Sequence, residues 1–214
     1  MSTVAVVKKN GVVAIAADTL SSFGVRKMPP AYDRRAGKIF RIGESYVGLT
    51  GWSVHQQVLE HAFASIGDPP ALASTTEIFD VFLALHLRLK QHYFLNSRAS
   101  EDDAYESARM SLLIANRHGI FGLYAMRSVI EHERFWASGS GSDYALGAMH
   151  AVYDGGGDAV AVAEAGVRAG VEFDEGTAAP VESHVIPLAG WASADELDRQ
   201  LKMLCSSPQS TVGS

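Results

Sequence analysis

The stretch STVAVVKKNGVVAIAAD, residues 2–18, decides the fold of this chain. It contains two β-prone apolar runs, residues 3–7 and 12–17, on either side of Asn10-Gly11. Asn-Gly between apolar runs is a strong hairpin signal, because both turn residues tolerate a positive φ. The second run is apolar on both faces of a strand, which predicts that it is buried between two layers.

The length of this turn decides which residue lies beside the chain start. With a two-residue turn, Lys9 pairs with Val12 and Thr3 faces Asp18. With a three-residue loop and a bulge, the register slips by one position and Ser2 faces Asp18. Either register puts Asp18 within one position of the chain start, where directly opposed Cβ atoms are about 5 Å apart.

Further along the chain, strands and helices are predicted in separate runs. The expected strands are residues 38–42, 46–49, 109–115, 120–125 and 181–188, and the expected helices are 54–63 (capped by Ser53), 76–95, one opening after the loop 138–142, 159–172 and 193–205. Residues 19–35 contain Pro29-Pro30 and are expected to form a loop. Runs of strands followed by runs of helices are typical of an α+β fold. Two sheets packed face to face, with helices outside, would explain the strands that are apolar on both faces.

Domain organisation follows from what the sequence lacks. There is no internal repeat and no linker, so we predict one domain over residues 1–214. Residues after about 206 are expected to form a flexible tail.

Composition argues against several classes of protein. The net charge of -6 argues against a nucleic-acid partner. No apolar stretch is long enough to span a membrane, and the N-terminus lacks the features of a signal peptide. The single cysteine, Cys205, excludes an intrachain disulfide and fits a cytoplasmic location. The histidines show no metal-binding spacing and no glycine run opens a phosphate loop, so we expect neither metal nor cofactor.

Ser2 is the candidate for chemistry at the chain start. Removal of Met1 would leave a serine with both a hydroxyl and a free α-amine, whose reference pKa is about 7.7–8.0. Such an amine is partly neutral near pH 7 and can take the proton from its own hydroxyl, directly or through a water. A nearby lysine would lower the pKa of the amine by like-charge repulsion, and Asp18 would hold that lysine.

Taken together, these features resemble the proteasome β-subunit family and its bacterial relative HslV. Residues 2–18 are similar to the opening hairpin of that family, and Gly37-Lys38-Ile39 to its catalytic-lysine strand. Residues 48–51 (Gly-Leu-Thr-Gly) resemble its oxyanion segment, and residues 139–145 its Gly-Ser-Gly loop before a helix. The four segments occur in the order of the family, and looser helical similarity continues to about residue 175.

The resemblance implies a four-layer αββα sandwich, the N-terminal-nucleophile hydrolase fold, and a role for each matching residue. Ser2 would be the nucleophile and, through its α-amine, the base. Lys38 would tune that amine and Asp18 would orient Lys38. Ser140 would form a hydrogen bond near the N-terminus, and the Gly51 N–H would donate to the oxyanion. Ser22 would help to hold the substrate backbone in an extended conformation. Glu172 would stand at the position of a family aspartate.

The resemblance also implies a function and partners. The chain would be a ring-forming peptidase that hydrolyses peptides or unfolded proteins through an acyl-enzyme on Ser2. Its partners would be copies of itself in a double ring of six or seven subunits per ring, and an AAA+ unfoldase, although no docking residue for one is identified.

The sequence departs from the family in two respects. The family nucleophile is usually threonine, so Thr3 is an alternative if two residues are removed. The segment from Thr19 to Gly37 is longer than in HslV. This departure, and the lack of identified docking residues for an ATPase, leave open a bacterial proteasome homologue outside the HslV branch. Two other functions stay open, a catalytically silent ring-forming homologue and a small-molecule amidase of the same class.

Overall fold

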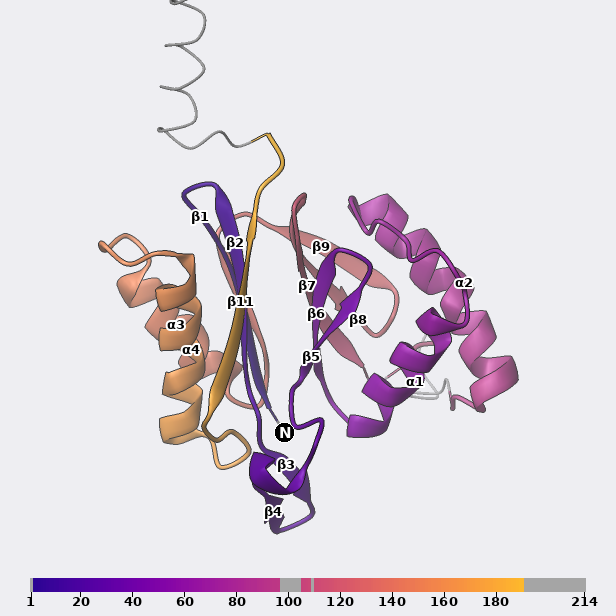
Figure 1. The fold of residues 1–214 in the computed structure, drawn as a ribbon, viewed down its shortest axis with the longest axis horizontal. Coiled ribbons are helices and arrows are strands. Elements are labelled where there is room, and N and C mark those ends of the chain that lie inside the picture. The colour runs from indigo at the N-terminus through magenta and orange to yellow at the C-terminus, as the bar shows by residue number, and fades with distance from the viewer. Residues whose placement is uncertain (1, 97–104, 109, 191–214) are drawn as a thin grey trace, which may run out of the picture.

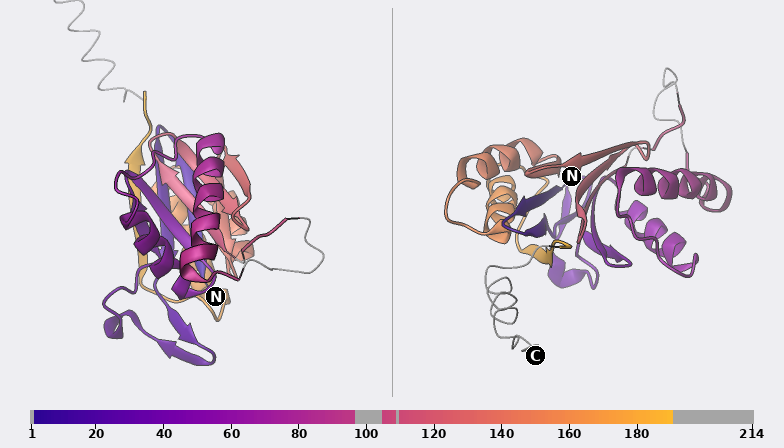
Figure 2. Two further views of the ribbon diagram at one scale, coloured as in Figure 1. Left: turned by 90° about the vertical axis from the view of Figure 1, so that its right-hand side faces the viewer. Right: turned by 90° about the horizontal axis from the view of Figure 1, so that it is seen from above.

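The computed structural model describes residues 2–96, 105–108 and 110–190. In these ranges the chain forms four layers, in which two sheets lie face to face between two pairs of helices (Figure 1). The view from above in Figure 2 separates the two helical layers clearly. The predicted αββα sandwich of the α+β class is therefore confirmed.

The two sheets have the following order and bounds. The first consists of β10 (Phe135–Gly139), β1 (Thr3–Lys9), β2 (Val12–Asp18) and β11 (Val181–Pro187). The second consists of β5 (Ile39–Ile42), β6 (Ser45–Thr50), β7 (Ser111–Asn116), β8 (Gly119–Tyr124) and β9 (Ser128–His132). All pairs of neighbouring strands in both sheets are antiparallel. Helices α3 (Ser142–Val152) and α4 (Ala159–Phe173) cover the first sheet, and α1 (Ser53–Ala64) and α2 (Thr75–Tyr93) cover the second.

The β1–β2 hairpin has the two-residue turn. Lys9 pairs with Val12. Asn10 and Gly11 both have positive φ, at 50° and 78°, as this tight turn requires. The backbone N–H of Thr3 meets the carboxylate of Asp18, so the first of the two predicted registers is correct.

Both faces of the hairpin are buried, because each faces a different apolar layer. Val4 and Val6 point into the space between the sheets. Ala5 and Val7 pack under α3 and α4. At Gly48 in β6 the two sheets approach so closely that an added Cβ would lie 2.5 Å from Val4 Cγ1.

Several elements differ from the sequence-based predictions. Strands β9 and β10 were not predicted, because each is the edge strand of its sheet and is mostly exposed or half-buried, which weakens the alternating pattern. Ser53 is the first residue of α1 rather than its cap, and Trp52 occupies the N-cap position without a side-chain bond. The predicted helix over 193–205 and the predicted tail lie outside the described residues.

The segment predicted as a loop, 19–35, contains a small hairpin. β3 (Ser21–Phe23) pairs with β4 (Arg26–Met28), and the short helix η1 (Pro30–Tyr32) follows. These strands are only three residues long and largely exposed, so no apolar alternation announces them. The hairpin projects from the end of the sandwich at which β1 begins (Figures 1 and 2).

Within the described ranges, none of the helices combines the length and the apolar character needed to cross a membrane. The same residues contain no group of three or more His, Cys, Asp or Glu side chains that could hold a metal ion.

Candidate active site

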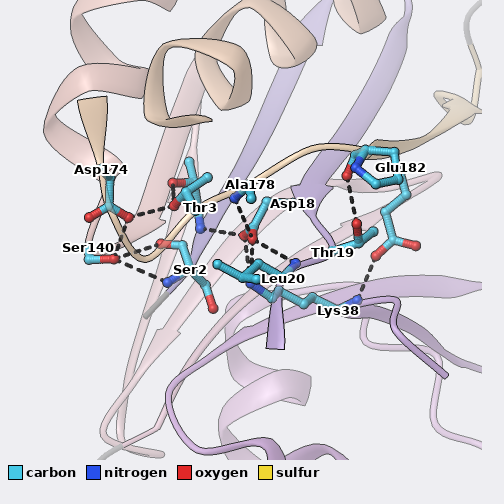
Figure 3. A network of polar contacts seen from close by, with 12 residues as sticks. Ser2, Thr3, Asp18, Thr19, Leu20, Lys38, Ser140, Asp174, Ala178 and Glu182 are labelled. Carbon is cyan, nitrogen blue, oxygen red and sulfur yellow. Dashed lines mark hydrogen bonds and ion pairs between the residues drawn. The ribbon is translucent and has the colours of Figure 1, made fainter. Parts of the chain in front are cut away.

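Four of the predicted site residues, Ser2, Asp18, Lys38 and Ser140, lie close together although they come from different parts of the fold (Figure 3). Ser2 precedes β1 and is buried. Asp18 ends β2, Lys38 precedes β5, and Ser140 lies between β10 and α3. The hairpin places Asp18 next to the chain start. Lys38 comes from the second sheet, and Ser140 follows β10 at the edge of the first sheet.

Asp18 is completely buried and surrounded by hydrogen-bond donors. Its Oδ1 accepts from the backbone N–H of Thr3 at 2.9 Å, and its Oδ2 accepts from that of Leu20 at 3.1 Å. The Ala178 N–H is a more distant donor to Oδ2, at 3.4 Å. These contacts hold the carboxylate in one orientation, ready to receive a cation.

That cation is Lys38. Its Nζ lies 2.7 Å from each oxygen of Asp18, and only 12% of the Lys38 side chain is exposed. Burial lowers the pKa of the Lys38 ammonium below its ordinary value, and the Asp18 carboxylate opposes this shift. A charge-assisted pair at this distance in a buried site has a well-defined geometry, so Lys38 is fixed beside the start of β1.

A second polar chain reaches Ser2 from the other side. The backbone N–H of Ser2 donates to Ser140 Oγ at 3.1 Å. Ser140 Oγ in turn donates to Asp174 Oδ2 at 2.7 Å, and Thr177 Oγ1 donates to the same oxygen at 2.5 Å. The nitrogen that would become the free α-amine is therefore held by a network that ends in a carboxylate.

Asp174 and Thr177 were not identified from the sequence. Glu172, the residue proposed for the acidic position, is exposed, and Asp174 at the end of α4 makes the contact with Ser140 instead. The only signal in the sequence was the cluster of polar residues directly after the helix. The point at which the helix ends decides which carboxylate faces Ser140, and a sequence pattern places that point only to within a few residues.

Thr3 is the alternative candidate nucleophile. Its side chain is fully buried, and its Oγ1 lies 2.7 Å from Thr177 Oγ1. A Cβ added to Gly141 or Gly170 would lie 2.1 or 2.5 Å from that oxygen, so two glycines make room for it. The Thr3 hydroxyl is thus packed against α4, the loop after it and the loop before α3.

Two cavities meet at Ser2. The larger, of about 1120 Å³, is lined by Ser2, Ser22, Lys38, Gly51 and Trp52 among others. The smaller, of about 550 Å³, is lined by Ser2, Gly51 and Ser140 together with mainly apolar neighbours. Gly51 has a φ of 129°, a conformation that favours glycine. Ser22 and Gly51 therefore line the space next to Ser2, although neither belongs to the hydrogen-bonded group.

The fold and the site together define a class of protein. A four-layer sandwich with a hydroxyl residue at the start of its first strand, beside a buried Lys–Asp pair, is the architecture of the N-terminal-nucleophile hydrolases.

Comparison with known proteins narrows this class to a family. The chain is 46% identical to BPH from Thiobacillus denitrificans in complex with epoxomicin, with a TM-score of 0.82 over 87% of this chain and 99% of that chain. A second structure of the same protein gives 46% identity and a TM-score of 0.83, covering 88% of this chain and 100% of that chain. HslV from Trypanosoma brucei shares the fold at 21% identity, with a TM-score of 0.65 over 86% of this chain and 99% of that chain. No family model and no curated protein matches. The chain therefore belongs to the proteasome β-subunit and HslV-like family, as a bacterial proteasome homologue.

Proposed function

We propose that this chain is the subunit of a ring-forming peptidase, which cleaves peptide bonds of peptides or unfolded proteins with Ser2 after Met1 is removed. The observation that carries the proposal is the buried Lys38–Asp18 pair beside the start of β1, with 2.7 Å from Nζ to each carboxylate oxygen. A buried pair of this kind is costly unless well bonded. Its position next to Ser2 favours a role in activating the N-terminal residue.

In the proposed reaction, the neutral α-amine of Ser2 takes the proton from Ser2 Oγ, directly or through a water. The oxygen attacks the carbonyl carbon of the substrate, and the carbonyl π electrons move to oxygen. The tetrahedral intermediate then expels the amine of the leaving peptide, which receives the proton from the Ser2 ammonium. An ester on Ser2 remains, and a water activated by the same amine hydrolyses it.

The neighbours of Ser2 would each support one of these steps. The positive charge of Lys38 would keep the α-amine neutral at working pH. Ser140 would orient the amine, since it already accepts from the Ser2 nitrogen. The Gly51 N–H would stabilise the oxyanion, a type of contact worth about 3–4 kcal/mol in other enzymes. Ser22, in the wall of the larger cavity, would pair with the backbone of an extended substrate.

The relative in complex with epoxomicin suggests a ligand to test on this chain. The two chains are 46% identical over most of their lengths. We therefore expect epoxomicin to bind this chain next to Ser2 and to inhibit its peptide hydrolysis.

The decisive experiment combines intact mass with turnover of a peptide panel. We expect a mass that lacks one methionine, together with peptide hydrolysis that falls to background in Ser2→Ala and by at least about 100-fold in Lys38→Ala. Undiminished activity in both variants would overturn the mechanism. Retained Met1 without activity would favour the silent ring, and cleavage of small amides alone would favour the amidase. The working location is proposed to be the cytoplasm, with an AAA+ unfoldase as the supplier of unfolded chains.

A further inference from the structure

Glu182 connects β11, the strand beside β2, to the segment that contains Lys38. It lies on β11, next to Val181, which pairs with Asp18 in the first sheet. Its carboxylate reaches toward the second sheet, where Oε1 accepts from Lys38 N at 2.6 Å and from Ile39 N at 3.0 Å (Figure 3). One side chain thus binds two consecutive backbone N–H groups at the start of β5.

On this side of β5, the second sheet has no further strand. β5 is the edge strand of that sheet, and it pairs on its other side with β6. Backbone donors on an edge strand need partners outside the sheet. Glu182 supplies one acceptor to both, so the main chain at Lys38 is tied to the sheet that also carries Asp18.

The surroundings of Glu182 are shaped to this contact. Gly37 leaves space for the carboxylate, because a Cβ added there would lie 2.7 Å from Glu182 Oε2. The side chain is half-buried, and burial raises the pKa of the Glu182 carboxyl. A half-buried carboxylate beside an exposed edge has to be compensated by good hydrogen bonds, which the two N–H donors provide.

We propose that Glu182 is a positioning residue, which holds the main chain of Lys38 so that its Nζ stays between the two oxygens of Asp18 and next to Ser2. The inference rests on the proposed function and adds a residue to it. Two residues on neighbouring strands of the first sheet fix the position of Lys38. Asp18 holds its Nζ, and Glu182 holds its backbone N–H. Loss of the second anchor would let the segment before β5 shift while the first sheet stays intact.

The test compares three substitutions of Glu182 in the full-length, processed protein. Glu182→Gln keeps an acceptor oxygen for both N–H groups, whereas Glu182→Met keeps the length of the side chain without that acceptor, and Glu182→Ala removes both. The control is Glu175→Ala, which removes an exposed carboxylate from the loop before β11. We expect Glu182→Met and Glu182→Ala to lower kcat by about 10–100-fold with little change in KM. Glu182→Gln and Glu175→Ala should stay within about threefold of the parent protein.

Hydrogen–deuterium exchange, read by mass spectrometry on a peptide over residues 37–42, gives a readout independent of turnover. Exchange should accelerate there in Glu182→Met and stay at the parent rate in Glu182→Gln, with the peptide over β1 unchanged in both. An active parent protein whose Glu182→Met variant matches it in kcat would overturn the positioning role and leave the proposed function standing. An inactive parent with a free Ser2 would instead defeat the proposed function, and the exchange rates alone would then decide whether Glu182 holds this segment.

Discussion

At the scale of single residues, the site combines two polar networks that meet at Ser2. Asp18 and Lys38 approach it from the hairpin and from β5. Ser140 and Asp174 approach it from the α3 and α4 side. The first network contains a buried ion pair, and the second connects the Ser2 nitrogen to a carboxylate through one hydroxyl. Thr3 joins the two networks, because its N–H donates to Asp18 and its Oγ1 contacts Thr177, which donates to Asp174.

The second network leads to a prediction for Asp174. Asp174→Asn keeps the shape of the side chain and removes the charge that accepts from Ser140 and Thr177. Because hydrogen bonds to charged groups are worth about 1.5–3 kcal/mol, kcat/KM for peptide hydrolysis should fall by about 10–100-fold. Glu172→Gln is the matched control on the exposed end of α4 and should have no effect. An equal loss in both variants would contradict the assignment of Asp174.

The raised pKa of Glu182 leads to a prediction about pH and stability. In the folded protein burial raises this pKa above the ordinary 4.5, so the folded state binds a proton more tightly than the unfolded state does. The stability that Glu182 contributes is therefore complete below pH 4.5 and is lost as the pH rises through the folded pKa.

Urea unfolding of the parent protein and of Glu182→Gln, measured in steps from pH 4 to 7.5, checks this sign. The free energy of unfolding of the parent should decrease relative to that of Glu182→Gln as the pH rises, because the other carboxyl groups cancel in the difference. If the difference in unfolding free energy between the two proteins is constant with pH, or increases as the pH rises, burial does not destabilise the ionised Glu182 carboxylate.

At the scale of elements, the contact between the sheets depends on Gly48. A methyl group there would lie 2.5 Å from Val4 Cγ1 and 3.2 Å from Ile15 Cδ1. Gly48→Ala should therefore lower the free energy of unfolding by about 1–3 kcal/mol through overpacking.

Gly147 offers a control for that substitution. It is exposed within α3, and an added Cβ would meet nothing within 4 Å. Gly147→Ala should stabilise the protein by about 0.5–1 kcal/mol, because alanine favours a helix interior. Denaturant unfolding of the two variants should give opposite signs, and stabilisation by both would mean that the sheets can move apart at no cost.

At the scale of the whole molecule, apolar side chains remain on the outer faces of both helical layers. Phe79, Leu83 and Leu87 are exposed along α2, and Tyr144 and Phe173 contact each other on the opposite side. Large apolar residues gathered on a surface often mark contacts between proteins, which agrees with the proposed ring.

The proposed ring predicts the size of the particle in solution. Sedimentation of the parent protein should give two stacked rings of six or seven subunits, at a size that does not change over a tenfold dilution. Ser2→Ala should form the same particle, because its substitution removes only a hydroxyl near the end of the sandwich. A single chain at all concentrations would exclude the ring, even if the peptidase activity is present.

Much of the fold and part of the site could be predicted from local pattern. The turn Asn10-Gly11 and the apolar runs beside it determined the hairpin, and counting along it placed Asp18 near the chain start. The two faces of those runs indicated a buried layer, and the helical periodicities located most helices. Such features depend on neighbours within a few residues, where backbone geometry and the alternation of side chains act directly.

The tertiary structure alone decided the rest of the site. Thr177 and Glu182 contact residues more than 130 positions away in the chain, and Asp174 contacts Ser140 across 34 positions. No period or motif in the sequence encodes such contacts. Which carboxylate faces Ser140 depends on where α4 ends, and the partner of the β5 edge depends on how β11 lies beside β2. The sequence by itself determined the β1–β2 hairpin and the candidate nucleophile. The packing of distant elements determined which groups hold that residue, because long-range contacts form only when the whole core is assembled.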